Sequence, residues 1–91
     1  MDDDTLNGWA AEFTGEDSPE MIKEIKASKY FTTNFASAMG ILAAMFSEGV
    51  DFGVEIEGDS VEVEVGEMTE TGGREEAARL VVKACYRYHN G

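Results

Sequence analysis

The chain contains little of what catalytic and metal chemistry require. Among its 91 residues there is one cysteine, one histidine and one proline. A single cysteine rules out an internal disulfide, and one cysteine with one histidine provides too few nitrogen and sulfur ligands for zinc. No Cys-His or Ser-His-Asp arrangement can be assembled from them. We therefore expect a protein that is not an enzyme and has neither a cofactor nor a metal site.

Positive charge is also scarce. Seven lysines and arginines stand against 19 acidic residues, a formal net charge of -12. Such a charge disfavours direct contact with nucleic acid or a membrane surface and favours a basic protein partner. The Met-Asp-Asp-Asp start lacks the positive region of a signal peptide, which favours a cytoplasmic location. With 43% hydrophobic residues, the composition is globular, and we expect one compact α+β domain over residues 1–91.

Charge is missing altogether from Tyr30 to Ser47, a run of 18 residues. That length reaches the lower limit of a membrane span, but polar residues dilute it, so we expect a buried central helix. Within the run, Ala36, Gly40 and Ala44 form a face of small residues at four-residue spacing. This spacing predicts a close helix contact at Gly40, with the C-terminal helix or, alternatively, with a second copy of the chain.

Two or three helices are predicted in the N-terminal half. A first helix is indicated by apolar residues at one-turn spacing, with three aspartates at its start: Leu6, Trp9, Ala10 and Phe13. Ser18-Pro19 is typical of a helix start, and Ile22 and Ile25 should then form a buried stripe. We expect this second helix to stop near Tyr30 to Thr33; the alternative is that it runs on through Phe46.

The C-terminal segment predicts a loop over Thr71-Gly72-Gly73 and then a helix from Arg74 to Asn90. The expected core face of this helix comprises Ala77, Leu80, Val81, Ala84, Cys85 and Tyr88. A second, solvent-facing stripe is basic: Arg74, Arg79, Lys83 and Arg87. The basic stripe could contact an acidic surface of a neighbouring copy, or relieve repulsion within one copy.

The most informative segment lies between Glu48 and Glu70, which contains nine carboxylates and no lysine or arginine. From Phe52 to Val65, aliphatic residues alternate with glutamates. This alternation predicts an antiparallel hairpin with one apolar face, covered by the C-terminal helix, and one anionic face. The candidate partner-binding residues are Glu55, Glu57, Asp59, Glu62, Glu64 and Glu67.

The expected turn fixes the register of this hairpin. With Gly58-Asp59 as a two-residue type II′ turn, Ile56 lies opposite Val61 on the apolar side. The same register sets Glu55 opposite Glu62, and like charges opposed across strands destabilise by roughly 0.2–1 kcal/mol. Folding alone would not select that arrangement, which favours an interaction surface for a cationic partner.

A small acidic chain with this order of elements resembles phage-encoded accessory proteins, including anti-CRISPR and DNA-mimic inhibitors. The likeness in pattern covers Val54 to Tyr88. It implies an inhibitor or decoy whose glutamates stand in for nucleic-acid phosphates on a basic groove. Alternate residues of a strand lie about 6.5–7 Å apart, a spacing that resembles the step between phosphates along one nucleic-acid strand.

Three other interpretations of the acidic surface stay open. The first is a solvated face that does no more than keep the protein in solution. The second is adaptation to high salt, against which stand the excess of glutamate over aspartate, thirteen to six, and the presence of a cysteine. Finally, the chain could be a structural or assembly protein whose hairpin pairs with its copy in a homodimer, because a lone hairpin is marginal and exposes its edges.

Overall fold

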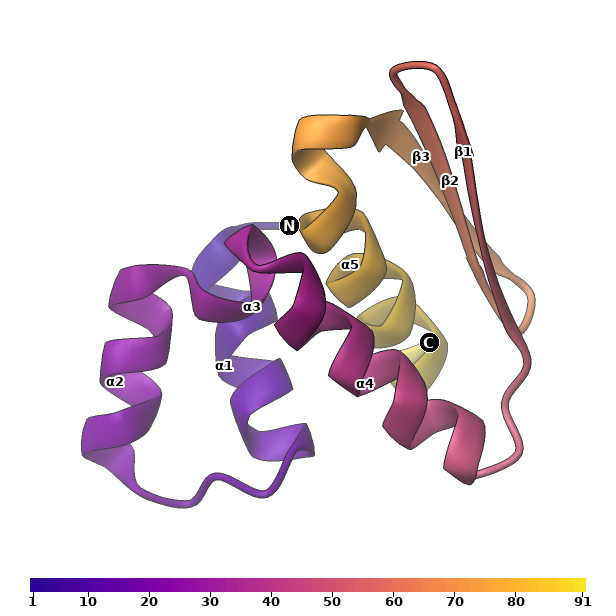
Figure 1. The fold of residues 1–91 in the computed structure, drawn as a ribbon. Helices are drawn as coiled ribbons and strands as arrows, with labels where there is room; N and C mark the ends of the chain where they lie inside the picture. The colour runs from indigo at the N-terminus through magenta and orange to yellow at the C-terminus, as the bar shows by residue number, and fades with distance from the viewer.

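The computed structural model describes residues 1–91 and has an α+β architecture (Figure 1). Four helices of ten or more residues and one helical turn accompany a three-stranded antiparallel sheet. The elements are α1 (Asp3–Phe13), α2 (Pro19–Ser28), α3 (Tyr30–Thr33), α4 (Phe35–Ser47), β1 (Phe52–Glu57), β2 (Ser60–Val65), β3 (Met68–Gly73), a 3-10 turn (Arg74–Glu76) and α5 (Ala77–Asn90). The predicted fold class is confirmed, with a third strand added to the hairpin.

Short polar side chains define where the helices begin. Asp2, Ser18 and Asn34 each accept a hydrogen bond from the backbone N–H three residues further on, as N-cap residues do. Helix α2 ends at Lys29, which adopts the left-handed conformation with φ of 54°. The predicted stop near Tyr30 to Thr33 is confirmed: the chain interrupts the helix at Lys29 and again at Asn34, and α3 is a separate turn between α2 and α4.

A buried asparagine holds this break in place. The Asn7 side chain is fully buried; its Nδ2 donates to Thr32 Oγ1 at 2.9 Å, and its Oδ1 accepts from the backbone N–H of Phe31 at 2.7 Å. The amide thus satisfies backbone and side-chain groups of α3 that would otherwise be buried without partners. Sequence reasoning missed this contact, because a polar residue beside an apolar stripe is usually solvent-facing.

The sheet has the order β1-β2-β3, and the predicted register of its first two strands is confirmed. Ile56 lies opposite Val61, and Glu55 lies directly opposite Glu62. Gly58 has a φ of 60°, the conformation that the first position of a type II′ turn requires.

The predicted loop over Thr71-Gly72-Gly73 is wrong, because these residues form the end of β3. The inner positions of β3 are Met68, Glu70 and Gly72, as its pairing with the buried face of β2 shows. This strand therefore lacks the apolar alternation by which strands are detected in a sequence. The sequence signal that could have revealed β3 is the glycine at Gly66, which has a φ of 56° and forms the turn between β2 and β3.

Helix α5 lies at the centre of the molecule. One side of it packs on β2 and β3, and its other sides contact α1, α3 and α4, while α2 packs mainly on α1 (Figure 1). The predicted packing of the last helix on the apolar face of the sheet is confirmed. Its fully or nearly fully buried residues are Ala78, Leu80, Val81, Val82, Ala84 and Cys85. Tyr88, predicted in the core, remains 40% exposed.

The predicted contact at Gly40 is wrong. A Cβ atom added at Gly40 would meet no atom within 4 Å, and Ala36 is exposed. Helix α4 buries only one side, formed by Ala38, Ile41, Leu42 and Met45. Small residues at four-residue spacing fit a solvent-facing side as well as a helix contact, so the spacing alone does not distinguish them. Ile22 and Ile25 are likewise only half-buried, because α2 lies at the periphery.

Candidate functional site

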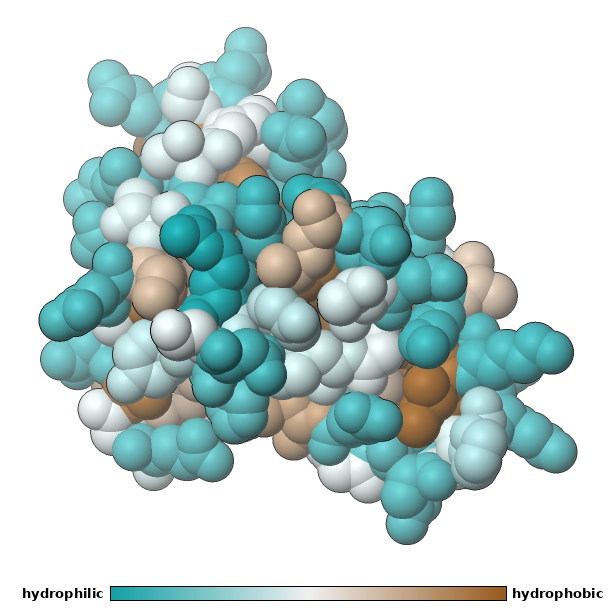
Figure 2. Space-filling model, turned by 180° about the vertical axis from the view of Figure 1, so that it is seen from behind, coloured by the Kyte–Doolittle hydropathy of each residue, from teal (hydrophilic) through white to brown (hydrophobic).

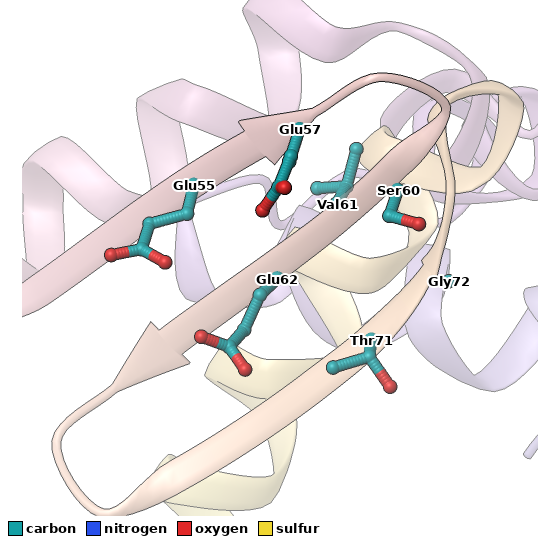
Figure 3. A pocket seen from close by; sticks show the side chains of 7 residues that line it. All are labelled: Glu55, Glu57, Ser60, Val61, Glu62, Thr71 and Gly72. Carbon is teal, nitrogen blue, oxygen red and sulfur yellow. The ribbon is translucent and has the colours of Figure 1, made fainter.

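The outer face of the sheet brings four glutamates together. Glu55 and Glu57 extend from β1, and Glu62 and Glu64 from β2, all on the side opposite to α5. We call these four residues the acidic face. Figure 3 shows three of them, Glu55, Glu57 and Glu62, with their carboxylates directed to the same side of the ribbon. The alternation of the two strands with a two-residue turn produces this arrangement.

A shallow hollow of about 510 Å³ lies over one end of the acidic face (Figure 3). Its lining residues come from all three strands: Glu55, Glu57, Ser60, Val61, Glu62, Thr71 and Gly72. Carboxylate oxygens only accept hydrogen bonds when ionised, and the two hydroxyls can donate or accept. The hollow therefore suits a cationic group with several N–H donors, such as a guanidinium or an ammonium group.

The two other candidate residues lie apart from the four. Asp59 is in the β1–β2 turn and Glu67 in the β2–β3 turn, at opposite ends of the sheet, and both are exposed. The backbone oxygen of Asp59 accepts a hydrogen bond from the N–H of Arg74. The guanidinium of Arg74 also reaches this turn, where it donates to Gly58 O at 3.0 Å. Asp59 thus has a cation nearby, whereas the acidic face does not.

No residue of the acidic face takes part in a salt bridge. The basic side chains of α5 are engaged on the other side of the sheet. Arg79 bonds Asp3 at 2.9 Å, and Lys83 and Arg87 both contact Glu70. The basic stripe therefore relieves repulsion within one copy, which was one of its two predicted roles.

Glu70 shows that not every acid of the carboxylate-rich segment is a surface group. It points inward from β3, is 8% exposed and lies between Lys83 and Arg87. A buried carboxylate needs such partners, because desolvation otherwise penalises its charge. Glu70 is thus a structural residue and does not belong to the acidic face.

Cys85 and His89, the residues whose side chains could act as a nucleophile or a base, both lie in α5 and not on the acidic face. Cys85 is fully buried in α5, and burial raises the pKa of its thiol to about 12, which keeps it protonated and unreactive. His89 lies near the end of α5 against the rings of Trp9 and Phe13, with centroid distances of 5.7 and 5.3 Å. Both residues contribute to packing at the positions where the structure places them.

Comparison with known proteins identifies no relative: no family model, no curated protein and no solved structure matches the chain. Within the chain, no group of three or more His, Cys, Asp or Glu side chains is arranged to hold a metal ion. None of the helices has both the length and the apolar character needed to cross a bilayer.

Proposed function

We propose that the protein is a non-catalytic binding protein whose acidic face engages a basic surface of a protein partner. The observation that carries this proposal is the pairing of Glu55 with Glu62 on a face whose glutamates form no salt bridge. The opposition of like charges reduces the stability of the free protein by roughly 0.2–1 kcal/mol. A partner with lysine or arginine at this face would remove that repulsion and gain favourable contacts.

The proposed mode of action is that of an inhibitor or decoy. Four glutamates on two adjacent strands present a regular array of negative charge, such as a basic groove built for a nucleic acid would attract. The resemblance to phage-encoded inhibitors supports this class of partner. Complementary charge mainly accelerates encounter, so we expect fast, salt-sensitive association.

The proposal is tested by affinity capture from a lysate with three versions of the protein. The first is the wild type, and the second replaces the acidic face by glutamine (Glu55→Gln, Glu57→Gln, Glu62→Gln, Glu64→Gln). The third is a control with the same change in net charge on α1, α2 and the loop between them (Glu12→Gln, Asp17→Asn, Glu20→Gln, Glu24→Gln), where all four acids are exposed. Mass spectrometry of the captured proteins should show basic proteins with the wild type and the control, and their loss with the acidic-face variant.

Equal capture by all three versions would show that capture depends neither on the acidic face nor on overall charge, and equal loss in both variants would show that only overall charge matters. The acidic face would then be a solvated surface, and the proposal would be wrong. The acidic-face variant should keep the stability of the wild type or exceed it slightly, because it removes repulsion without changing any core residue. Thermal unfolding of the variant measures this stability, so that a loss of capture can be distinguished from unfolding.

A further inference from the structure

A second feature of the molecule is apolar and lies along β1 and α4. Phe35, Phe46, Phe52 and Ile56 are 40%, 63%, 38% and 50% exposed. All four belong to these two elements. By contrast, the face of the molecule seen from behind is mainly hydrophilic, with apolar surface in small separate areas (Figure 2). Large exposed apolar side chains that gather along neighbouring elements indicate an interaction site.

We use the word groove for the strip between α4 and β1 that these residues border. At one end, Phe35 and Ile56 line a cavity of about 310 Å³ together with apolar residues of β2 and the start of α5 and with the polar side chains of Thr33, Arg74 and Glu75. At the other end, Phe46 meets Phe52 edge-on, with ring centroids 6.0 Å apart. Helix α4 and strand β1 therefore run side by side in opposite directions. The groove is left open because α5 packs on β2 and β3, whereas β1 packs closely only on β2.

Strand β1 also has free backbone groups along its outer edge. The N–H of Gly66 donates to the backbone oxygen of Asp51 at 2.8 Å. The backbone groups of Asp51 therefore point towards β2. Bonded and non-bonded pairs alternate along an antiparallel ladder. The residues whose N–H and C=O groups point away from the sheet are therefore Phe52, Val54 and Ile56. The strand carries no proline, lysine or bulge that would block pairing at this edge.

We propose that β1 pairs with β1 of a second copy, antiparallel about a two-fold axis at Val54, to form a continuous six-stranded sheet. In this register Val54 lies opposite Val54 of the second copy, and Phe52 lies opposite its Ile56. The same axis places the Phe46 and Phe52 end of the groove next to the Phe35 and Ile56 end of the other groove. The surface is thus complementary to itself, as a two-fold interface requires.

This register keeps opposed like charges out of the centre of the paired segment. Moving the axis to Glu55 would set Glu55 directly opposite its own copy, at a cost of roughly 0.2–1 kcal/mol. With the axis at Val54, Glu55 lies opposite Gly53 of the second copy, and the like-charged Glu57 and Asp51 face each other at the two ends of the paired segment. The two acidic faces then lie side by side on one sheet, so the dimer would enlarge the surface proposed above for a basic partner without depending on it.

The exposed apolar area has the size that a dimer needs. An aromatic side chain carries about 150–250 Å², so the exposed parts of the three phenylalanines and Ile56 amount to about 300–400 Å². A standard interface buries about 800 Å² on each partner, of which a little over half, roughly 450 Å², is apolar. The half-buried Val54 and Met39 lie on the same two elements and contribute further area.

Sedimentation equilibrium at several salt concentrations tests this inference by measuring the dimer association constant. Salt should strengthen dimerisation and weaken the binding of a basic partner, so the two proposed interactions can be distinguished. Each copy carries a formal charge of -12, so dimerisation works against repulsion that salt screens. The dimer association constant should rise about threefold or more between about 50 and 500 mM potassium chloride, whereas binding of a basic partner should weaken. A protein that stays monomeric at all concentrations and salt levels, or a dimer that weakens with salt, would overturn the proposed pairing.

Two variants with identical charge changes locate the interface. Ile56→Lys places a cation in the groove and should abolish the dimer, whereas Met21→Lys alters a similarly exposed apolar residue on α2, 44% against 50%, and should leave dimerisation unchanged. Phe46→Ser is a second groove variant at the most exposed of these side chains, and its monomer should fold normally. Unaltered dimerisation of both groove variants would place the interface elsewhere and overturn the proposal.

Amide hydrogen exchange tests the edge directly. The N–H groups of Phe52, Val54 and Ile56 should be protected in the wild-type dimer and should exchange rapidly in the Ile56→Lys monomer. Those of Glu55 and Glu57, which bond to β2, should be protected in both. Rapid exchange at Val54 in a wild-type dimer would contradict strand pairing. None of these results depends on whether the acidic face binds a partner.

Discussion

The two edge strands of the sheet, β1 and β3, differ in how far other parts of the chain cover and neutralise their inward-pointing side chains. Strand β3 lies under α5 and turns Glu70 inward, where Lys83 and Arg87 neutralise it. Strand β1 turns Phe52, Val54 and Ile56 inward; Phe46 of α4 meets Phe52, but Phe52 and Ile56 remain exposed and Val54 is only half-buried. The chain thus satisfies the charge and the packing of one edge internally and leaves both unsatisfied at the other.

This difference explains where the molecule has surface left for interaction. An inward-pointing charge is one of the ways in which proteins prevent an edge strand from pairing with another chain. Glu70 supplies that protection at β3, and β1 has no equivalent. The acidic face begins on the same unprotected strand, so the acidic face and the exposed apolar residues lie on the two sides of β1.

The largest expected effect compares two valines that face each other across β1 and β2. Val63 is fully buried and Val54 only half-buried, although they are paired in the ladder. Val63→Ala should lower the free energy of unfolding by about 2–3 kcal/mol, and Val54→Ala by about 1 kcal/mol or less. Urea denaturation at low protein concentration measures both. Equal losses would show that β1 is covered as well as β2, and the comparison would fail.

An intermediate effect compares two glutamates. Glu70→Gln removes the charge between two cations and should destabilise by about 1 kcal/mol, a modest value because Lys83 and Arg87 are partly solvated. Glu55→Gln relieves the repulsion with Glu62 and should be neutral or stabilise by up to about 0.5 kcal/mol. Both variants change the net charge by one unit in the same direction. Melting-temperature shifts of opposite sign, each measured from the wild type, would therefore reflect the local environment of each glutamate. Shifts of the same sign would mean that overall charge dominates.

The smallest expected effect concerns the open side of α4. Gly40→Ala adds a methyl group where nothing lies within 4 Å, so it should stabilise by about 0.5–1 kcal/mol through helix propensity alone. Gly8→Ala is the matched control, because its Cβ would come within 2.7 Å of Lys26 Cε, and it should gain less. Thermal unfolding measures both variants. A loss of stability in Gly40→Ala would indicate that this side of α4 is packed after all.

The sequence predicts well those features that are specified by neighbouring residues. The register of β1 and β2 follows from alternation and from Gly58 at the turn, and the starts of the first two helices follow from the N-terminal aspartates and from Ser18-Pro19. These signals need no knowledge of tertiary structure, which is why they could be read correctly.

Features that depend on distant partners could not be predicted in this way. Strand β3 has only one large apolar residue on its inner side, Met68. Glu70 can occupy another inner position because Lys83 and Arg87 of α5, which come later in the chain, neutralise its charge. Likewise, the exposure of α4 at Gly40 is set by the positions of other elements, such as β1 and α5, which the local sequence does not reveal. For the candidate site, the four glutamates were found from alternation alone, whereas the internal role of Glu70 needed the structure.

The most direct test of the central claim is the association rate between the protein and its most strongly captured basic partner, measured across a salt series. If the acidic face is the binding surface, the wild-type rate should fall about tenfold or more between about 50 and 500 mM salt. The variant with Glu55, Glu57, Glu62 and Glu64 replaced by glutamine should associate slowly even at low salt, with little salt dependence. Equal rates for both proteins with a flat salt dependence would contradict the account.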